Sequence, residues 1–246
     1  MSTKKVSRAF KAFKALIAAV YPKYGLEGVE NIPQEPCIIV GNHSQLHGPI
    51  VSQLYMPVKC QTWCMGSMMN LKEVPDYAFE DFWSGKPKRS HWFYKILAHL
   101  IAPVSVFIFN NADTIGVYHD ARIISTLKQT VKVLSEGESV VIFPEYHKEY
   151  NGILYDFREN FVEVARLYHK KTGKNLSFVP MYICPELKRL CFGNKITFDP
   201  DLYDKEKKEE MRVYLMEEIT RLARELDEHT VIPYDNIPKK KYPKNK

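Results

Sequence analysis

The chain has 246 residues, of which 45% are hydrophobic and 13% aromatic, so it can bury a full core, and this composition excludes an intrinsically disordered protein. The 35 Lys and Arg against 29 Asp and Glu give a net charge of +6, which favours an anionic partner such as a membrane, a coenzyme or a nucleic acid. Five cysteines, an odd number, without a recognisable secretory leader exclude a disulfide-built secreted protein and predict a reduced, cytoplasmic location.

A basic amphipathic helix is expected first, over residues 4–21. On a helical wheel its apolar side chains share an arc of about 140°, and basic residues take the rest. With aromatic residues on its apolar side, such a helix is typical of a segment that lies in a bilayer interface. A helix that packs its apolar side on the core is the alternative. We assign residues 1–24 to an amphipathic helix for the membrane interface.

Apolar, β-branched runs alternate with helical patterns along the rest of the chain. Strands are expected at 37–42, 58–64, 104–109, 139–143 and 177–183. Helices are expected at 49–56, 91–102, 120–135, 157–172 and 203–228. The alternation predicts the α/β class, as a single domain over residues 25–230 with a largely parallel central sheet flanked by helices.

No segment is expected to span a membrane. The longest uncharged run, residues 96–109, has 14 residues, whereas a spanning helix needs about 20. This run is interpreted as a buried helix followed by a strand. The stretch 70–90 contains helix breakers and is expected to form an inserted loop or short helices, whose aromatic residues cover either a lipid chain or the sheet. Residues 231–246 are expected to be a basic flexible tail that favours anionic lipid.

Two of the expected strands end in polar residues. Asn42 and His43 follow the apolar run that begins at Ile38, and Glu145 follows the run 139–143 after a proline. Sheets of the α/β class place their chemistry in the crevice outside the carboxyl ends of the strands. We therefore predict that His43 and Glu145 reach the same crevice.

Four short blocks of the sequence carry a resemblance to a known family. The chain has Gly-Val-Glu-Asn-Ile-Pro at 28–33, an apolar strand ending in Asn-His at 38–43, Phe-Pro-Glu at 143–145 and Val-Pro-Met-Tyr-Ile at 179–183. In this order and spacing the blocks resemble the lysophospholipid acyltransferases of the 1-acylglycerol-3-phosphate acyltransferase type. The resemblance covers roughly residues 25–200, and the order of the blocks is stronger evidence than any single block.

The resemblance implies an O-acyltransferase of phospholipid biosynthesis that is peripheral on the cytoplasmic face of a membrane. Its acyl donor is acyl-CoA or acyl carrier protein, and its acceptor is a lipid such as a lysophospholipid. No metal, no other cofactor and no nucleic acid is implied as a partner. His43 is then the general base that deprotonates the acceptor hydroxyl, and Glu145 is the second predicted catalytic residue.

Three charged positions depart from the family pattern. Gly48 replaces the aspartate that orients the imidazole, which predicts a slow enzyme, a substitute for the aspartate such as Glu145 or His47, or no enzyme. Lys148 and His119 stand where the family has arginines for the acceptor phosphate, and neither offers the bidentate fork of arginine. The remaining predicted contacts with substrate are Asn42, Ser44, His47, Arg122 and Arg158.

Two other functions remain open. His43 and His47 have the i, i+4 spacing of a metal hydrolase, but the glutamate that zinc proteases use as base does not follow His43. Cys60 and Cys64 also have a metal-ligand spacing, without a second pair to complete a site. The stronger alternative is a catalytically inactive protein that keeps the acyltransferase fold and binds lipid or membrane.

Overall fold

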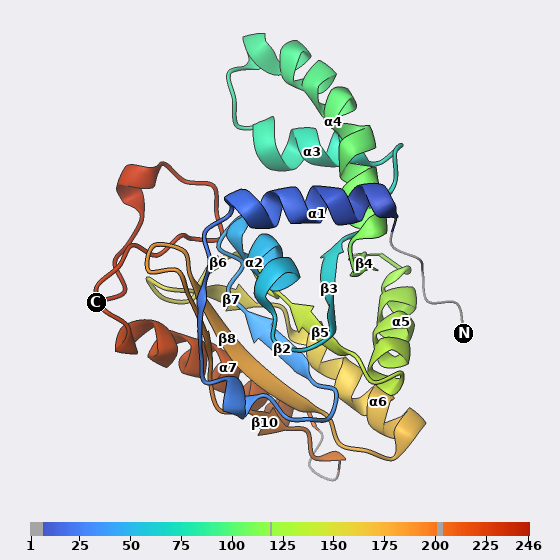
Figure 1. Cartoon of the computed structure of the whole chain (residues 1–246), viewed down its shortest axis with the longest axis vertical. Helices are drawn as coiled ribbons and strands as arrows, with labels where there is room; N and C mark the ends of the chain where they lie inside the picture. The colour runs from blue at the N-terminus through green and yellow to red at the C-terminus, as the bar shows by residue number, and fades with distance from the viewer. Residues whose placement is uncertain (1–6, 119, 201–203) are drawn as a thin grey trace. The chain divides into compact units, whose positions relative to one another are not determined.

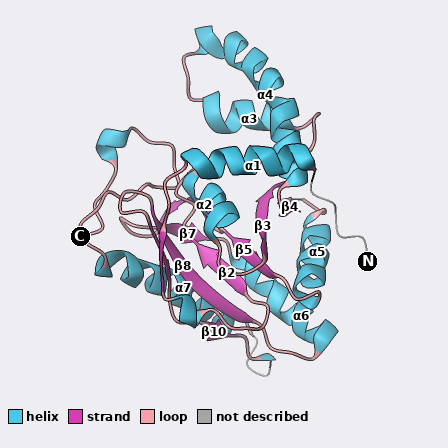
Figure 2. Ribbon diagram, viewed as in Figure 1, coloured by secondary structure: helices cyan, strands magenta, loops and turns pink. Residues whose placement is uncertain are grey.

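The structure, a computed structural model, describes residues 7–118, 120–200 and 204–246 (Figure 1). The chain divides into two compact units, which we describe separately. The sheet unit comprises Pro22–Thr62 and Leu127–Lys246. The hairpin unit comprises Met1–Tyr21 and Trp63–Thr126. The α/β class with a mostly parallel central sheet is confirmed (Figure 2).

In the sheet unit the strands lie in the order β1-β9-β8-β2-β5-β3. Its strands are β1 (Gly25–Glu27), β2 (Ile38–Gly41), β3 (Cys60–Met65), β5 (Ser139–Ile142), β8 (Ser177–Cys184) and β9 (Arg189–Phe192). Strand β2 lies between β5 and β8 and is parallel to both. Strands β8 and β9 form an antiparallel hairpin, and β10 (Ile196–Thr197) also pairs antiparallel to β8. The sheet therefore combines a parallel centre with an antiparallel edge.

The apolar runs become the innermost strands, as the sequence predicts. Ile38, Ile39, Val140 and Val141 are fully buried, so the middle of the sheet is covered on both faces. Helices α2 (His47–Tyr55), α6 (Glu163–Thr172) and α7 (Lys205–Glu225) belong to this unit, and α5 (Ile123–Ser135) runs into it from the other. Helix α7 packs on β8 through buried residues of one side, among them Met211, Leu215, Ile219 and Leu222.

The hairpin unit contains α1 (Arg8–Val20), α3 (Val74–Trp83), α4 (His91–Asn111) and β4 (Thr114–Val117), and β3 ends in it. The expected N-terminal helix is present, and residues 1–6 of the predicted segment 1–24 lie outside the described residues. Helices α3 and α4 fold back on each other around a small apolar cluster that includes Val74, Phe79 and Ala98. The stretch 70–90 thus forms short helical elements, one of its two predicted forms.

The prediction for residues 104–109 is wrong, because α4 continues through them to Asn111. β-Branched and aromatic residues there favour a strand by propensity, but packing in the helical hairpin overrides that weak preference. Pro103 lies inside the helix, although it removes one main-chain hydrogen bond. The segment Lys88–Asn111 is long and apolar enough to cross a membrane, judged by length and composition alone, where the sequence pattern predicted no such segment.

The C-terminal segment, residues 231–246, differs from the expected flexible tail because it is tied to the sheet unit. Asn245 is buried, and its side chain donates to the carbonyl of Ala223 at 2.8 Å and accepts from the main-chain nitrogen of His229 at 2.9 Å. The main-chain nitrogen of Val231 donates to the carbonyl of Pro243 at 2.9 Å. A buried, fully bonded amide fixes this segment despite its lysines and prolines.

Candidate active site

The polar residues that follow β2 and β5 meet at the carboxyl ends of these two strands. Strands β2 and β5 are parallel neighbours with Val40 opposite Ile142, so their carboxyl ends stop side by side. His43 lies just beyond β2, and Glu145 opens the short strand β6 (Glu145–Glu149) just beyond β5. The main-chain nitrogen of His43 donates to Oε2 of Glu145 at 2.5 Å. The structure thus brings together the two residues predicted as catalytic.

Asn42 and Ser44 have their polar atoms engaged within the protein. The Asn42 amide donates to the Ser44 hydroxyl at 2.7 Å and to the carbonyl of Ile183 at 3.1 Å. Its oxygen accepts from the main-chain nitrogen of Ile183 at 2.7 Å. Both side chains are buried, so they hold the end of β2 against β8 and fix the turn that carries His43.

The His43 side chain is half-buried. Burial lowers its pKa to about 4, and a hydrogen bond with the main chain of Gln45 opposes that shift. Ser44 and Gln45 both have left-handed backbone angles, with φ of 45° and 53°. These angles are uncommon for residues with a side chain, and they fold the turn back toward His43. The main chain of Gln45 thus offers the ring a hydrogen bond from within the same turn.

Gly48 is required by a close approach of the main chain. Its nitrogen donates to the carbonyl oxygen of His43 at 3.0 Å. A Cβ placed on Gly48 would lie 2.3 Å from that oxygen and 3.2 Å from the ring of Phe143. The tight turn that leaves no room for a Cβ at position 48 therefore also leaves no room for an aspartate there.

Glu145 is an enclosed carboxyl group. Oε1 accepts from the main-chain nitrogen of Tyr155, on the antiparallel strand β7 (Tyr155–Phe157), at 3.0 Å. Burial raises the pKa of Glu145 to about 7, although the hydrogen bonds from the nitrogens of His43 and Tyr155 oppose the shift. The negative charge of Asp235 adds to the increase.

The C-terminal segment covers His43, which the sequence did not indicate. The Tyr234 ring meets the His43 ring edge to face, with centroids 5.8 Å apart, and it also contacts the rings of His147 and Tyr155. Asp235 is 2.5 Å from the His147 imidazole, Oδ1 to Nδ1. The sequence signal for this contact is a tyrosine within a basic stretch that contains several prolines.

A hydrogen bond also ties this segment to the turn after β2. The Gln45 amide donates to the Tyr242 hydroxyl at 3.0 Å. The pKa of His47 is lowered, first by burial and then by the positive charge of Lys239. The C-terminal segment therefore lies over the His43 turn through both Tyr234 and Tyr242.

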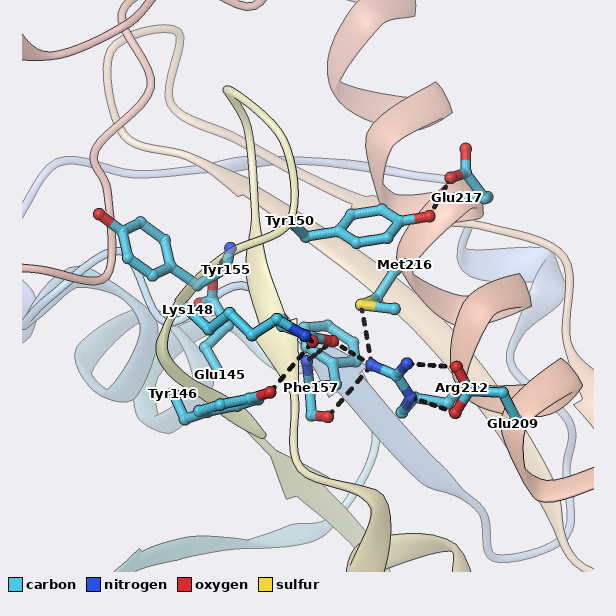
Figure 3. A network of polar contacts seen from close by, with 11 residues as sticks. Glu145, Tyr146, Lys148, Tyr150, Tyr155, Phe157, Glu209, Arg212, Met216 and Glu217 are labelled. Carbon is cyan, nitrogen blue, oxygen red and sulfur yellow. Dashed lines mark hydrogen bonds and ion pairs between the residues drawn. The ribbon is translucent and has the colours of Figure 1, made fainter. Parts of the chain in front are cut away.

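Lys148, predicted as a phosphate contact, is paired within the protein (Figure 3). Its Nζ is 2.8 Å from the Asp156 carboxylate, which also forms an ion pair with Arg212 of α7. Burial alone would raise the pKa of Asp156, but its bonds to Lys148, Tyr146 and Arg212 keep it below its usual value. The Arg158 guanidinium lies 5.5 Å from the Tyr146 ring centre, above one face.

The other predicted contacts lie elsewhere or outside the described residues. His119 lies outside the described residues. Arg122 belongs to the hairpin unit, where Asp120 and Glu73 hold its guanidinium. Within the described ranges no three His, Cys, Asp or Glu side chains are grouped to hold a metal ion, so His43 and His47 find no third ligand there. All five cysteines are free thiols.

Comparison with known proteins bears on the fold. No family model matches the sequence, and no curated protein matches it. The structure is similar to the crystal structure of the 1-acyl-sn-glycerophosphate (LPA) acyltransferase PlsC from Thermotoga maritima, with a TM-score of 0.51 and 15% sequence identity, covering 87% of this chain and 76% of that chain. At this identity the similarity concerns the fold alone. The fold that the sequence resemblance implied is therefore confirmed as an acyltransferase-like fold.

Proposed function

We propose that the protein is an acyltransferase that moves a fatty acyl group from acyl-CoA or acyl carrier protein to a lipid acceptor such as a lysophospholipid, with His43 as general base. The observation that carries the proposal is the position of His43 at a strand tip, where the Glu145 carboxyl accepts a hydrogen bond from its main chain. Burial lowers the pKa of the imidazole, so the ring is neutral at physiological pH, the form that a general base requires.

The reaction requires one proton to move twice. His43 takes the proton of the acceptor hydroxyl while the oxygen attacks the thioester carbonyl. The tetrahedral adduct then collapses, the bond from carbon to sulfur breaks, and the leaving thiolate takes the proton back from the imidazolium. Glu145 bonds the main chain of His43 rather than its ring, so we assign it the role of a positioning residue.

The surroundings of Lys148 favour an acceptor that does not depend on a tightly held phosphate. A phosphate at Lys148 has to compete with the Asp156 carboxylate, which lies 2.8 Å from Nζ. Arg158, another predicted contact with substrate, lies over the Tyr146 ring. We therefore expect the protein to use neutral or zwitterionic hydroxyl lipids as acceptors in addition to lysophosphatidic acid.

We place the protein in the cytoplasm, peripheral on the cytoplasmic membrane face. Five free thiols support a reducing compartment. Helix α1 supports the membrane association, because its apolar residues Leu16 and Val20 are 63% and 73% exposed.

The test is an assay of the purified full chain with acyl-CoA and acyl carrier protein donors against a panel of hydroxyl and amine lipid acceptors. We expect His43→Ala to reduce turnover by about 10²- to 10⁴-fold. His169→Gln, on α6, is the matched histidine control and should keep its activity. Activity that survives His43→Ala would refute the mechanism. No turnover with any pair, together with retained lipid binding, would favour the inactive lipid-binding alternative.

A further inference from the structure

Helix α4 exposes one continuous apolar face. Trp92, Phe93, Ile96, Leu100 and Val104 are 66%, 52%, 52%, 68% and 56% exposed. At 100° per residue, these positions lie within an arc of about 120°. Ala98, Ala102 and Ser105, the buried residues of the helix, occupy the opposite side. We call the five exposed residues the α4 face.

The opposite side of α4 is already occupied. Ala98 and Ala102 pack into the cluster formed with Val74, Ala78 and Phe79 of α3. Contiguous exposed apolar side chains are unusual on a soluble protein and mark a surface that another partner covers. The α4 face is thus the unpartnered side of an otherwise packed helical hairpin.

The charged residues in the segment that carries this face have one sign. From Ser84 to Asn111 the sequence has no Asp or Glu, whereas Lys86, Lys88, Arg89 and Lys95 are all exposed. Trp92 and Phe93 lie between Arg89 and Lys95 in the sequence. Cations beside aromatic residues at one end of an apolar stripe match the headgroup boundary of an anionic bilayer.

We propose that the α4 face docks the protein onto anionic lipid, with Trp92 and Phe93 at the headgroup level. The inference deepens the membrane association in the proposed function, and it does not depend on the acyl-transfer step. The acidic residues Asp76, Glu80 and Asp81 of α3 are exposed, so the hairpin lies in the interface and does not cross the bilayer.

A second copy of the chain fits the α4 face less well. In a two-fold pair the same patch faces itself, so Lys86, Lys88 and Arg89 of one copy would lie near those of the other without a carboxylate in the segment 84–111 to balance them. Anionic headgroups supply the missing negative charge.

The first experiment measures binding of the full-length protein to vesicles of phosphatidylcholine containing phosphatidylglycerol, by sedimentation at low salt. We expect Leu100→Asp to weaken binding at least about tenfold, because it places a carboxylate at the centre of the apolar face. Ile124→Asp is the matched control, since Ile124 is 58% exposed but belongs to α5. Unfolding temperatures check that both variants remain folded.

Leu16→Asp, a change on α1, tests whether α1 and not α4 anchors the protein to the vesicles. Loss of binding in Leu16→Asp with full binding in Leu100→Asp would overturn the proposal and make α1 the anchor. A dimer in sedimentation equilibrium that Leu100→Asp dissociates, with vesicle binding unchanged, would overturn it in favour of a second copy. His43→Ala should bind vesicles as the unmodified protein does, so failure of the catalytic proposal remains distinguishable.

The second experiment uses Trp92 as a reporter. With Trp63 and Trp83 changed to Phe, the remaining tryptophan fluorescence should shift to shorter wavelength on adding the same vesicles and should be quenched by brominated lipid. Vesicle binding without a shift or quenching would show that the α4 face stays in water, which contradicts the proposal.

Discussion

The main-chain nitrogen of His43 donates to Oε2 of Glu145 at 2.5 Å, although the two residues are 102 positions apart in the chain. Oε1 of the same carboxyl accepts from the nitrogen of Tyr155 at 3.0 Å. One buried side chain thus satisfies two main-chain donors and links the tips of β2 and β5 to the β6–β7 hairpin. Without it, both main-chain donors, which are partly buried, would lose their acceptor.

Glu145→Gln should therefore lower the stability of the fold. An amide has a single acceptor oxygen, so one of the two nitrogens would face an NH2 group, at a cost of about 1–3 kcal/mol. Urea unfolding measures the change. Glu149→Gln, at the exposed end of β6, is the control and should change stability by less than about 0.5 kcal/mol. Equal stability of both variants would mean that the His43–Glu145 bond contributes nothing.

The pH dependence of stability should contain two opposing contributions. The pKa of Glu145 is raised from 4.5 to about 7, so the unfolded chain releases this proton first and stability falls as pH rises through that window. The pKa of His43 is lowered from 6.5 to about 4, so the unfolded chain binds this proton first and stability falls as pH decreases through that window. The two contributions partly cancel in the unmodified protein.

Single variants should separate the contributions of Glu145 and His43 to the pH dependence of stability. His43→Gln leaves the carboxyl, so its stability should decrease as pH rises from 4.5 to about 7. Glu145→Gln leaves the imidazole, so its stability should increase as pH rises from about 4 to 6.5. Urea unfolding at a series of pH values gives both slopes. Parallel curves for the two variants would contradict the assignment of the two shifts.

Gly48→Asp should destabilise the protein and lower acyl-transfer activity. Its Cβ would lie 2.3 Å from the carbonyl oxygen of His43, so the turn has to open. Gly48→Ala adds the same Cβ without the carboxylate and should lose a similar amount, about 2 kcal/mol or more. Thermal unfolding and turnover of both variants decide the question. A faster Gly48→Asp enzyme at unchanged stability would show that the aspartate is compatible with this site.

Tyr234→Ala should open the site around His43. The Tyr234 ring lies edge to face with the imidazole, 5.8 Å between centroids, and shields it from water. Its removal should raise the pKa of His43 from about 4 toward its ordinary value of 6.5, since burial is the main cause of the shift. Titration of the imidazole by NMR measures this. Tyr242→Phe, which loses the bond to Gln45 but keeps a ring, is the comparison.

An unchanged His43 titration in Tyr234→Ala would mean that Phe143 and the surrounding main chain enclose the ring by themselves. The Phe143 ring lies 5.4 Å from that of His43, centroid to centroid. In that case the C-terminal segment would not control water access to the base.

The sequence by itself determined the frame of the candidate site. Short apolar runs predicted β2, β5 and β8, because burial on both faces demands continuous hydrophobic residues. The polar residues just beyond those runs indicated where His43 and Glu145 would be. Local patterns carry this information since strands and helices repeat at fixed periods.

Only the tertiary structure decided how the frame is completed. The helical state of 104–109 follows from packing in the hairpin, against the local propensity of its residues. The hydrogen bond between the Gln45 main chain and the imidazole depends on left-handed backbone angles at Ser44 and Gln45, which the side chains of these residues do not predict. Tyr234 reaches His43 from the far end of the chain because a buried Asn245 fixes the C-terminal segment. Such contacts join single residues across long separations, so they leave no periodic trace in the sequence.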